Sequence, residues 1–267
     1  MKLYNYVLTC SKTADRLPAF LECFRRARER FLDGYLKDVD GSVDASDDKV
    51  LASYSLNVVH GMNSERFERS PWWRVGAVRT ELPDRKTGNG LDRRGHTACY
   101  WGHVQEWRQA LGEHDDAFTD GAALFFEDDC RLDEDFWPRV FQGFDELPED
   151  WEIFYVGGQL CVNGRPRPPV FSAHLYHADN VNRTHAYCVK LSALPKLILW
   201  FEENHDWGHN FRDAKTGQSE AEVDYAIGHL IETGVFNAYA LRPWACGQAA
   251  GFSWTQCRDY PERRWEL

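Results

Sequence analysis

Three consecutive acids, Glu127, Asp128 and Asp129, close the apolar run from Ala122 to Phe126. The run is continuous rather than alternating, which predicts a buried strand of a parallel sheet. Open α/β sheets bind their ligands at the carboxyl ends of such strands. Adjacent carboxylates repel one another unless water, a basic side chain or a cation offsets their charge, and a hard divalent cation with oxygen ligands does this well. The acids are therefore candidate ligands for a metal ion at a sheet edge.

The same segment also has a simpler interpretation as a solvated turn. Asp133, Glu134 and Asp135 follow closely and suit the first turn of a helix, where the helix dipole favours negative charge. Acidic turns are common in proteins. This segment alone leaves both interpretations open.

The elements that must position these acids alternate between strand and helix patterns, which predicts an α/β fold with a mostly parallel central sheet. The strands are expected at Leu3 to Thr9, around Leu56 to Val59, and at Ala122 to Phe126, Trp151 to Gly158, Thr184 to Val189 and Asn237 to Leu241. The helices are expected at Leu17 to Leu36, Gly95 to Leu111, Phe136 to Leu147, Ala193 to Glu203 with Ser192 as its cap, and Glu220 to Glu232. The first strand runs into a polar turn without a P-loop or a dinucleotide-binding glycine motif. Most of the region from Asp38 to Arg94 shows no assignable pattern.

Composition restricts the class of protein and its partners. The 267 residues include 31 basic and 42 acidic side chains, a formal charge of −11 that argues against a broad nucleic-acid-binding surface. No apolar stretch is long enough to cross a bilayer and the first residues lack the apolar run of a signal peptide, so we expect a soluble, cytoplasmic chain. The eight cysteines are scattered without the close pairs of structural zinc sites, and most are expected to be buried small hydrophobes.

Several segments, in order along nearly the whole chain, resemble glycosyltransferase family 25, the lipopolysaccharide-biosynthesis and collagen galactosyltransferase-like group. The most specific pair is the apolar strand ending in Glu127-Asp128-Asp129 together with Thr184-His185-Ala186-Tyr187. Further matches are Asp15-Arg16, Gly95 to His103, Trp151 to Gly157, Val223-Asp224, and Pro243 with Gln248 and Ser253. The chain departs from the family pattern at Ala98, Gly102 and Arg183, where glycine, serine and glycine are usual.

The resemblance implies a single GT-A-type, Rossmann-like domain over residues 1–267. Residues 1–130 would mainly bind the nucleotide sugar, and residues 131–267 would mainly form the acceptor side. The implied activity is the metal-dependent, inverting transfer of a hexose such as galactose or glucose from a UDP-sugar to a hydroxyl acceptor on a glycan or another macromolecule. The sequence does not identify the acceptor.

The resemblance also implies a role for each site residue. Glu127 and Asp129 would hold Mn²⁺ or Mg²⁺, whose charge offsets that of the leaving diphosphate. Asp224 would be the base that takes the proton of the acceptor hydroxyl. The donor would contact Thr9, Arg16, His103, Glu127, Asp128, His185, Gln248 and Ser253.

Most of these residues have a simpler alternative. Asp224 could be a helix-surface acid beside Glu220 and Glu222, and His185 a buried strand histidine bonded to backbone. His103 suits a structural role on spacing alone. Gln248 and Ser253 could belong to an ordinary C-terminal loop.

Three other functions share the same sequence features. The first is a catalytically inactive sugar-binding module that uses tryptophans as stacking platforms. The tryptophans in polar, loop-like segments are Trp72, Trp73, Trp207, Trp254 and Trp265. The second is a phosphoryl-transfer enzyme that uses the same acids and cleaves at phosphorus. The third is a glycosyltransferase acting on modified DNA bases, against which the acidic charge argues.

Overall fold

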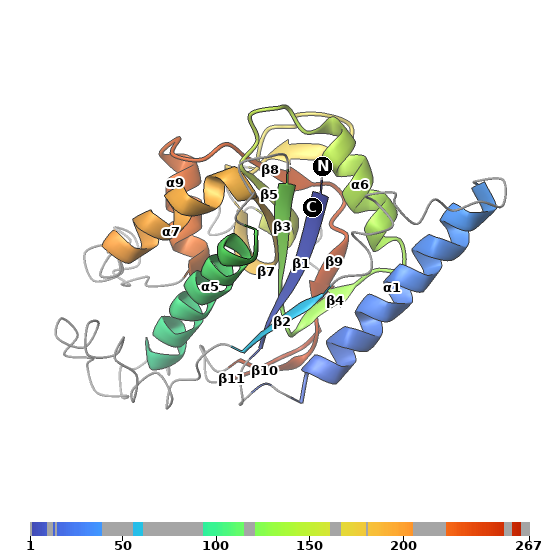
Figure 1. The fold of residues 1–267 in the computed structure, drawn as a ribbon, viewed down its shortest axis with the longest axis horizontal. Coiled ribbons are helices and arrows are strands. Elements are labelled where there is room, and N and C mark those ends of the chain that lie inside the picture. Colours follow the sequence, from blue (N-terminus) through green and yellow to red (C-terminus); the bar gives the residue numbers. More distant parts are fainter. Residues whose placement is uncertain are drawn as a thin grey trace.

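The fold is built on a seven-stranded sheet with the strand order β2-β1-β3-β7-β5-β8-β6 (Figure 1). It is known from a computed structural model that describes residues 2–9, 13, 15–38, 56–60, 93–114, 121–160, 167–179, 181–204, 223–253 and 258–262. The strands are β1 (Lys2–Thr9), β2 (Asn57–His60), β3 (Gly121–Glu127), β5 (Ile153–Leu160), β6 (Leu175–His177), β7 (Val181–Lys190) and β8 (Ala238–Leu241).

The sheet is mixed, although most of its strands share one direction. β1 is parallel to β2 and β3, and β5 is parallel to β8, whereas β7 is antiparallel to both β3 and β5. β6 runs antiparallel to β8. Five strands therefore point one way while β7 and β6 point the other way. The predicted α/β fold with a mostly parallel sheet is confirmed in this mixed form.

The antiparallel course of β7 brings its first residues to the edge where β3 ends. Phe126 pairs with Ala186, so Thr184 and His185 lie beside the acids that follow β3. Two segments that the sequence separates by more than fifty residues thereby meet at one edge.

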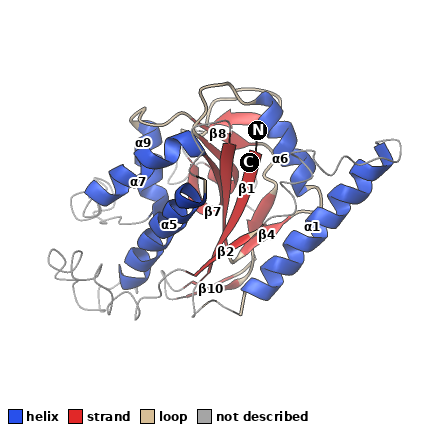
Figure 2. Ribbon diagram, in the orientation of Figure 1, coloured by secondary structure: helices blue, strands red, loops and turns tan. Residues whose placement is uncertain are grey.

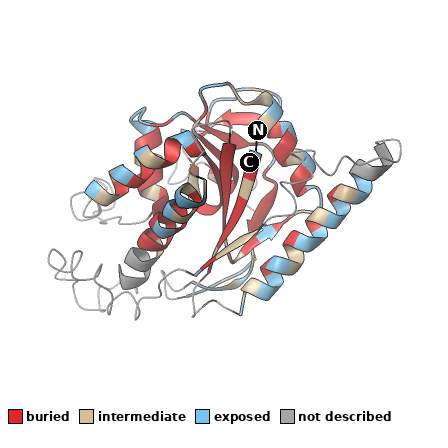
Figure 3. Ribbon diagram, in the orientation of Figure 1, coloured by how far each residue is buried: buried red, intermediate tan, exposed pale blue. Residues whose placement is uncertain are grey.

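Helices cover both faces of the sheet (Figures 1 and 2). α5 (Arg93–Glu113), α7 (Leu194–Glu203) and α9 (Val223–Glu232) lie on one face, and α1 (Leu17–Asp38) and α6 (Phe136–Glu146) lie on the other. Each turns its buried side toward the sheet (Figure 3). On α1, Phe20, Phe24, Ala27 and Phe31 recur at helical spacing and are buried, as the sequence pattern predicts.

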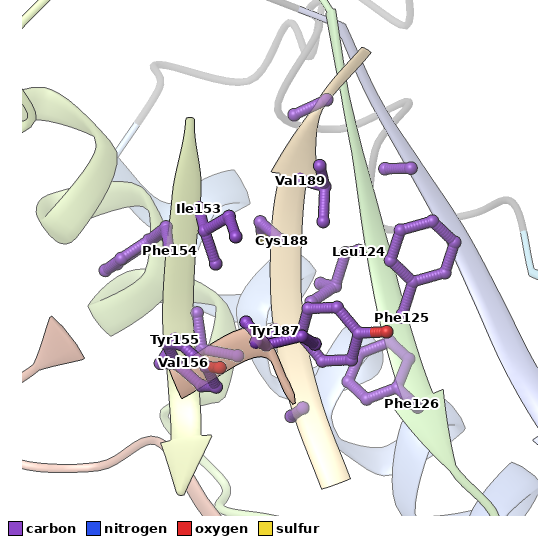
Figure 4. Close-up of a cluster of buried hydrophobic side chains, with 14 of the residues drawn as sticks. Leu124, Phe125, Phe126, Ile153, Phe154, Tyr155, Val156, Tyr187, Cys188 and Val189 are labelled. Atoms are coloured by element: carbon purple, nitrogen blue, oxygen red, sulfur yellow. The ribbon is translucent and has the colours of Figure 1, made fainter. Parts of the chain in front are cut away.

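The apolar run of β3 is buried on both faces. Leu124, Phe125 and Phe126 have no exposed surface, and the ring of Tyr187 in β7 lies against that of Phe125 (Figure 4). Phe125 and Phe126 point to opposite sides, since successive side chains alternate along a strand. A continuous apolar run is therefore what this strand requires.

The sequence analysis did not predict two short antiparallel strand pairs. β4 (Cys130–Leu132) pairs antiparallel with β9 (Cys246–Gln248), and β10 (Gly251–Ser253) pairs with β11 (Arg258–Tyr260). Strands of three residues are too short to show a periodic pattern. The first ladder sets Gln248 opposite Cys130, directly beside the acids.

The cap expected at Ser192 is wrong. Ser192 lies within a short 3₁₀ turn, Leu191–Ala193, and the helix that follows is capped at Ala193 without a side-chain hydrogen bond. The 3₁₀ turn leads the chain from β7 directly into α7, and Ala193 rather than Ser192 occupies the cap position of the helix. In the described part of the chain, no helix has the length and apolar character needed to span a bilayer.

A substitution at Gly143 on α6 tests how closely this helix packs on the sheet. A Cβ atom at this position would lie 2.5 Å from Phe154 Cζ and 2.9 Å from Leu241 Cδ1. We expect Gly143→Ala to lower the free energy of unfolding by about 1–3 kcal/mol, because overpacking forces its buried neighbours to move. Chemical denaturation measures this change.

Gly34 on α1 is the matched control, since a Cβ there meets nothing within 4 Å. Gly34→Ala should raise stability by roughly 0.5–1 kcal/mol, the difference in helix propensity. Equal effects of the two substitutions would contradict the close approach of α6 to the sheet.

Candidate active site

Glu127, Asp128 and Asp129 leave the end of β3 and make separate sets of contacts. Glu127 is the last residue of β3, and the two aspartates form the turn into β4. Among the described residues, these three acids do not form a group whose ligand atoms all lie within 4.8 Å of one another. Each acid must therefore be considered with its own partners.

Asp128 connects the end of β1 to the end of β3. Its Oδ2 accepts hydrogen bonds from Thr9 Oγ1 at 2.7 Å and from Thr13 Oγ1, and Arg16 Nη1 lies 3.8 Å from Oδ1. Burial raises the pKa of Asp128 to about 6, against the opposing effect of the two threonine hydroxyls. The predicted site residues Thr9 and Asp128 thus lie in direct contact where β1 and β3 end.

Asp129 has one satisfied and one unsatisfied oxygen. Its Oδ2 accepts from Gln248 Nε2 at 3.0 Å and from Arg16 Nη1 at 3.4 Å. Its Oδ1 is buried and has no hydrogen-bond partner in the described part of the chain. Burial and the charges of Glu127 and Asp128 raise the pKa of Asp129 to about 7. An unpaired buried carboxylate oxygen is a costly arrangement that a bound cation would relieve.

Arg16 joins the acids to the C-terminal part of the chain. Besides its contacts with the two aspartates, its Nη2 donates to the carbonyl oxygen of Phe252 in β10. Ser253 follows directly in the same strand, but its side chain lies outside the described residues. The predicted residues Arg16 and Gln248 are therefore brought together around Asp129.

Glu127 faces β7 and α5 instead. Its Oε1 accepts a hydrogen bond from Thr184 Oγ1 at 2.6 Å and lies 3.4 Å from His103 Nε2. Burial by itself raises the pKa of Glu127, but the nearby His103 and the Thr184 hydroxyl outweigh it and hold the pKa at about 2. Glu127 is consequently an anion at neutral pH, and its side chain is 25% exposed.

His103 is fully buried within a polar group on the inner side of α5. Its Nδ1 lies 3.1 Å from the Tyr187 hydroxyl and 3.4 Å from Glu106 Oε2, and Trp107 Nε1 donates to the same hydroxyl at 2.8 Å. Burial lowers the pKa of His103, yet Tyr187 and the neighbouring carboxylates raise it well above its ordinary value. The structural role that spacing favoured for this histidine agrees with its burial.

Cys99 completes a potential ligand group with His103 and Glu127. One ligand atom from each of these three residues lies within 4.8 Å of the others. The sequence prediction placed metal ligands only at Glu127 and Asp129, so the thiol and the imidazole are additions made by the structure.

His185 is buried and neither of its ring nitrogens has a hydrogen-bond partner among the described residues. Burial lowers its pKa to about 4, so the ring is neutral at pH 7. The alternative of a strand histidine bonded to backbone is therefore not what the structure has. A Cβ atom at Gly157 would clash with Cys246 Sγ and would lie only 3.0 Å from His185 Nε2, which explains why a residue without a side chain stands there.

Asp224 is buried in the first turn of α9, so its interpretation as a surface acid is wrong. Its Oδ2 accepts from the backbone N–H of Arg183 at 3.1 Å, and its Oδ1 accepts from the N–H of Tyr225 at 3.0 Å. Arg183 precedes Thr184, which bonds Glu127. Asp224 is thereby connected to the acids through two neighbouring residues of β7.

The structure adds residues that the sequence reasoning missed. Thr13, Cys99, Glu106, Thr184 and Tyr187 all contact a predicted site residue. Cys99, Thr184 and Tyr187 lie inside segments that carried the family resemblance, which is a signal that could have found them. Glu106 sits one helical turn after His103, and its burial was not apparent from the sequence because glutamate is mostly exposed in proteins.

Comparisons with known proteins give distant structural likenesses. No family model and no curated protein matches this chain. The structure is similar to A197 from STIV, with 9% identity and a TM-score of 0.40 over 100% of this chain and 97% of that chain. Mouse xyloside xylosyltransferase 1 in its apo form shows 11% identity and a TM-score of 0.42 over 88% of this chain and 83% of that one.

A further similar structure is a glycosyltransferase involved in the glycosylation of the major capsid of PBCV-1. It shows 10% identity and a TM-score of 0.34, over 90% of this chain and 93% of that chain. Two of the three names are those of glycosyltransferases. Likenesses this distant assign no family, so the function must be argued from the site.

Proposed function

We propose that this protein is a metal-dependent glycosyltransferase that moves a hexose, such as galactose or glucose, from a UDP donor to a hydroxyl acceptor on a glycan or another macromolecule. The observation that carries the proposal is Asp129 at the carboxyl end of β3, a buried carboxylate whose Oδ1 has no hydrogen-bond partner among the described residues, beside two further acids. The sequence resemblance supplies the reaction type, and the geometry of the acids is compatible with it.

The acids fit a hard divalent cation, Mn²⁺ or Mg²⁺. Within the described ranges Asp129 Oδ1 lacks a hydrogen-bond partner, and Glu127 is held in its anionic form. These two residues would hold the ion, and water and diphosphate oxygens would complete its coordination, as is usual for such ions at phosphate sites. The bound cation would offset the negative charge that gathers on the departing diphosphate.

The residues around Asp129 would bind and orient the donor. Arg16 and Gln248 already fix the position of the second carboxylate oxygen, and Thr9 holds Asp128. We place His185 in the donor site because its ring nitrogens need partners that a ligand could supply. Ser253 is included through its position next to the Arg16 contact.

Asp224 would act as the base in an inverting displacement. The acceptor oxygen would form a bond to the anomeric carbon while the bond from that carbon to the diphosphate oxygen breaks. Asp224 would take the hydroxyl proton in this step, and UDP would leave with the electron pair of the broken bond. His103 would contribute to the site through its contact with Glu127.

The five tryptophans of the sugar-binding hypothesis, Trp72, Trp73, Trp207, Trp254 and Trp265, lie outside the described residues. Neither phosphoryl transfer nor transfer to modified DNA bases is favoured by a specific contact.

A panel of nucleotide sugars with and without Mn²⁺ tests the proposal. We expect UDP-hexoses to raise the Tm by several degrees only when Mn²⁺ or Mg²⁺ is present, because a ligand at 100 times its Kd stabilises the native state by about 2.7 kcal/mol. Slow release of UDP from the donor, measured by product analysis, should accompany binding.

The products separate the alternatives. Sugar binding without UDP release would favour the sugar-binding module. Cleavage at phosphorus, which yields a sugar phosphate, would favour phosphoryl transfer. If no nucleotide sugar in the panel raises the Tm at any metal concentration, the proposal is contradicted.

A further inference from the structure

Cys99 and His103 form a chelating pair on α5. They are four residues apart, so their side chains project from the same face of the helix on successive turns. Glu127 approaches this pair from the end of β3, and one ligand atom of each residue lies within 4.8 Å of the others. A thiol, an imidazole and a carboxylate thus converge from two elements.

The separation between His103 and Glu127 suits metal ligands better than it suits a hydrogen bond. Their Nε2 and Oε1 atoms are 3.4 Å apart. Hydrogen bonds of this type are usually about 2.9–3.0 Å long. Two ligands bound tetrahedrally to zinc at about 2.1 Å lie about 3.4 Å from each other.

The outer contacts of both ligands are those of a metal site. The second ring nitrogen of His103 faces Glu106 Oε2 and the Tyr187 hydroxyl, and metal-binding histidines commonly bond a carboxylate through that nitrogen. Thr184 donates to Glu127, as ligating carboxylates are typically hydrogen-bonded. These contacts fix the orientation of both side chains before any ion arrives.

Glu106 provides an independent observation. It is completely buried, and neither of its carboxylate oxygens has a hydrogen-bond partner in the described part of the chain. Its Oε2 lies 3.4 Å from His103 Nδ1, and a buried carboxylate is costly unless that neighbour carries positive charge. A divalent cation on the far side of the His103 ring would supply that charge through the imidazole.

We infer that Cys99, His103 and Glu127 form a second metal site, selective for zinc rather than for the hard ion proposed at Asp129. A thiolate and an imidazole favour zinc, whereas Mn²⁺ and Mg²⁺ prefer oxygen ligands. Three protein ligands leave a fourth position for water. Glu127 would then be shared between the zinc and the ion proposed at Asp129. Since its ring nitrogens are both engaged, His103 does not contact the diphosphate.

Metal analysis of the purified 267-residue chain tests this inference without reference to sugar transfer. After expression with supplemented zinc, we expect one zinc per chain by elemental analysis. Replacement with Co²⁺ should give a thiolate-to-cobalt absorption band. Cys99→Ser should lose the band and the stoichiometric zinc. Cys23→Ser, which changes a partly buried thiol on α1, should retain both.

Milder variants keep the test valid if Cys99→Ser does not fold. Glu106→Gln should weaken zinc binding by about 10–100-fold in a chelator competition, the usual effect of removing an outer carboxylate. Asp129→Asn should leave zinc affinity unchanged. Absence of stoichiometric zinc from the wild-type chain, or the same zinc affinity in Glu106→Gln as in the wild type, would overturn the inference. Neither result bears on Mn²⁺-dependent donor binding, which is measured separately.

Discussion

Asp129→Asn is expected to abolish sugar transfer and Mn²⁺-dependent nucleotide binding while it makes the metal-free protein more stable at neutral pH. Loss of a cation that contributes several kcal/mol to transition-state stabilisation corresponds to a decrease in rate of at least about 10³-fold. The asparagine oxygen can still accept from Gln248 and Arg16, so the local structure should persist. Activity assays and thermal unfolding measure the two effects on the same preparation.

The increase in stability follows from the raised pKa of Asp129. In the unfolded chain an aspartate titrates near pH 4, whereas burial and the adjacent acids raise the pKa of Asp129 to about 7 in the fold. Between these values the folded protein holds a proton that the unfolded chain has released, so stability decreases as pH rises through this window. Asparagine removes this penalty. We expect a Tm increase of about 2–4 °C above pH 7, the change that about 1 kcal/mol produces, and none below pH 4.

Asp135→Asn is the matched control for this experiment. Asp135 is 53% exposed and pairs with Arg139 on the surface of α6, so its loss should change stability by less than about 0.5 kcal/mol and leave transfer intact. If Asp129→Asn were destabilising and fully active, Asp129 would be a structural residue and the metal site proposed here would be incorrect.

Asp224→Asn is expected to reduce sugar transfer by about 10²–10⁴-fold without changing the affinity for the donor. This range is the usual contribution of a general base. The amide retains one acceptor oxygen for the N–H of Arg183 or of Tyr225, and donor binding relies on other residues. Initial rates at saturating acceptor, together with the thermal shift produced by the donor, separate the chemical step from binding.

Glu232→Gln changes an exposed acid at the other end of α9 and should have no effect on either measurement. A pronounced loss of donor binding in Asp224→Asn would indicate that Asp224 acts by supporting β7 rather than as a base. Normal rates would show that the proton leaves by another route.

The sequence predicted the main strands and helices because their patterns are strong. The run before Glu127 is apolar at every position, and the apolar residues of α1 recur at helical spacing. The acids were predicted as a group, but the structure gives each of them different partners. This difference in partners depends on Thr9, Thr184 and Gln248, which come from three distant parts of the chain. Local sequence patterns carry no information about such contacts.

Arg183 shows why one departure from the family pattern could not be interpreted from sequence. It occupies the position where the resembled family usually has glycine, and its φ of 76° lies in the region that favours glycine. The hydrogen bond from its N–H to Asp224 holds this conformation. The sequence revealed an unusual residue, and only the backbone angle explains the preference for glycine there.

The contact between Arg16 and the carbonyl oxygen of Phe252 spans 236 positions in the chain. During synthesis, β1, β3 and the acids leave the ribosome long before Gln248 and Phe252 are made. A nascent chain at that stage holds Asp129 without its amide partner and Arg16 without its carbonyl anchor. The arrangement of the acids is therefore completed late, and chains released early by the ribosome would present the acids without the contacts that orient them.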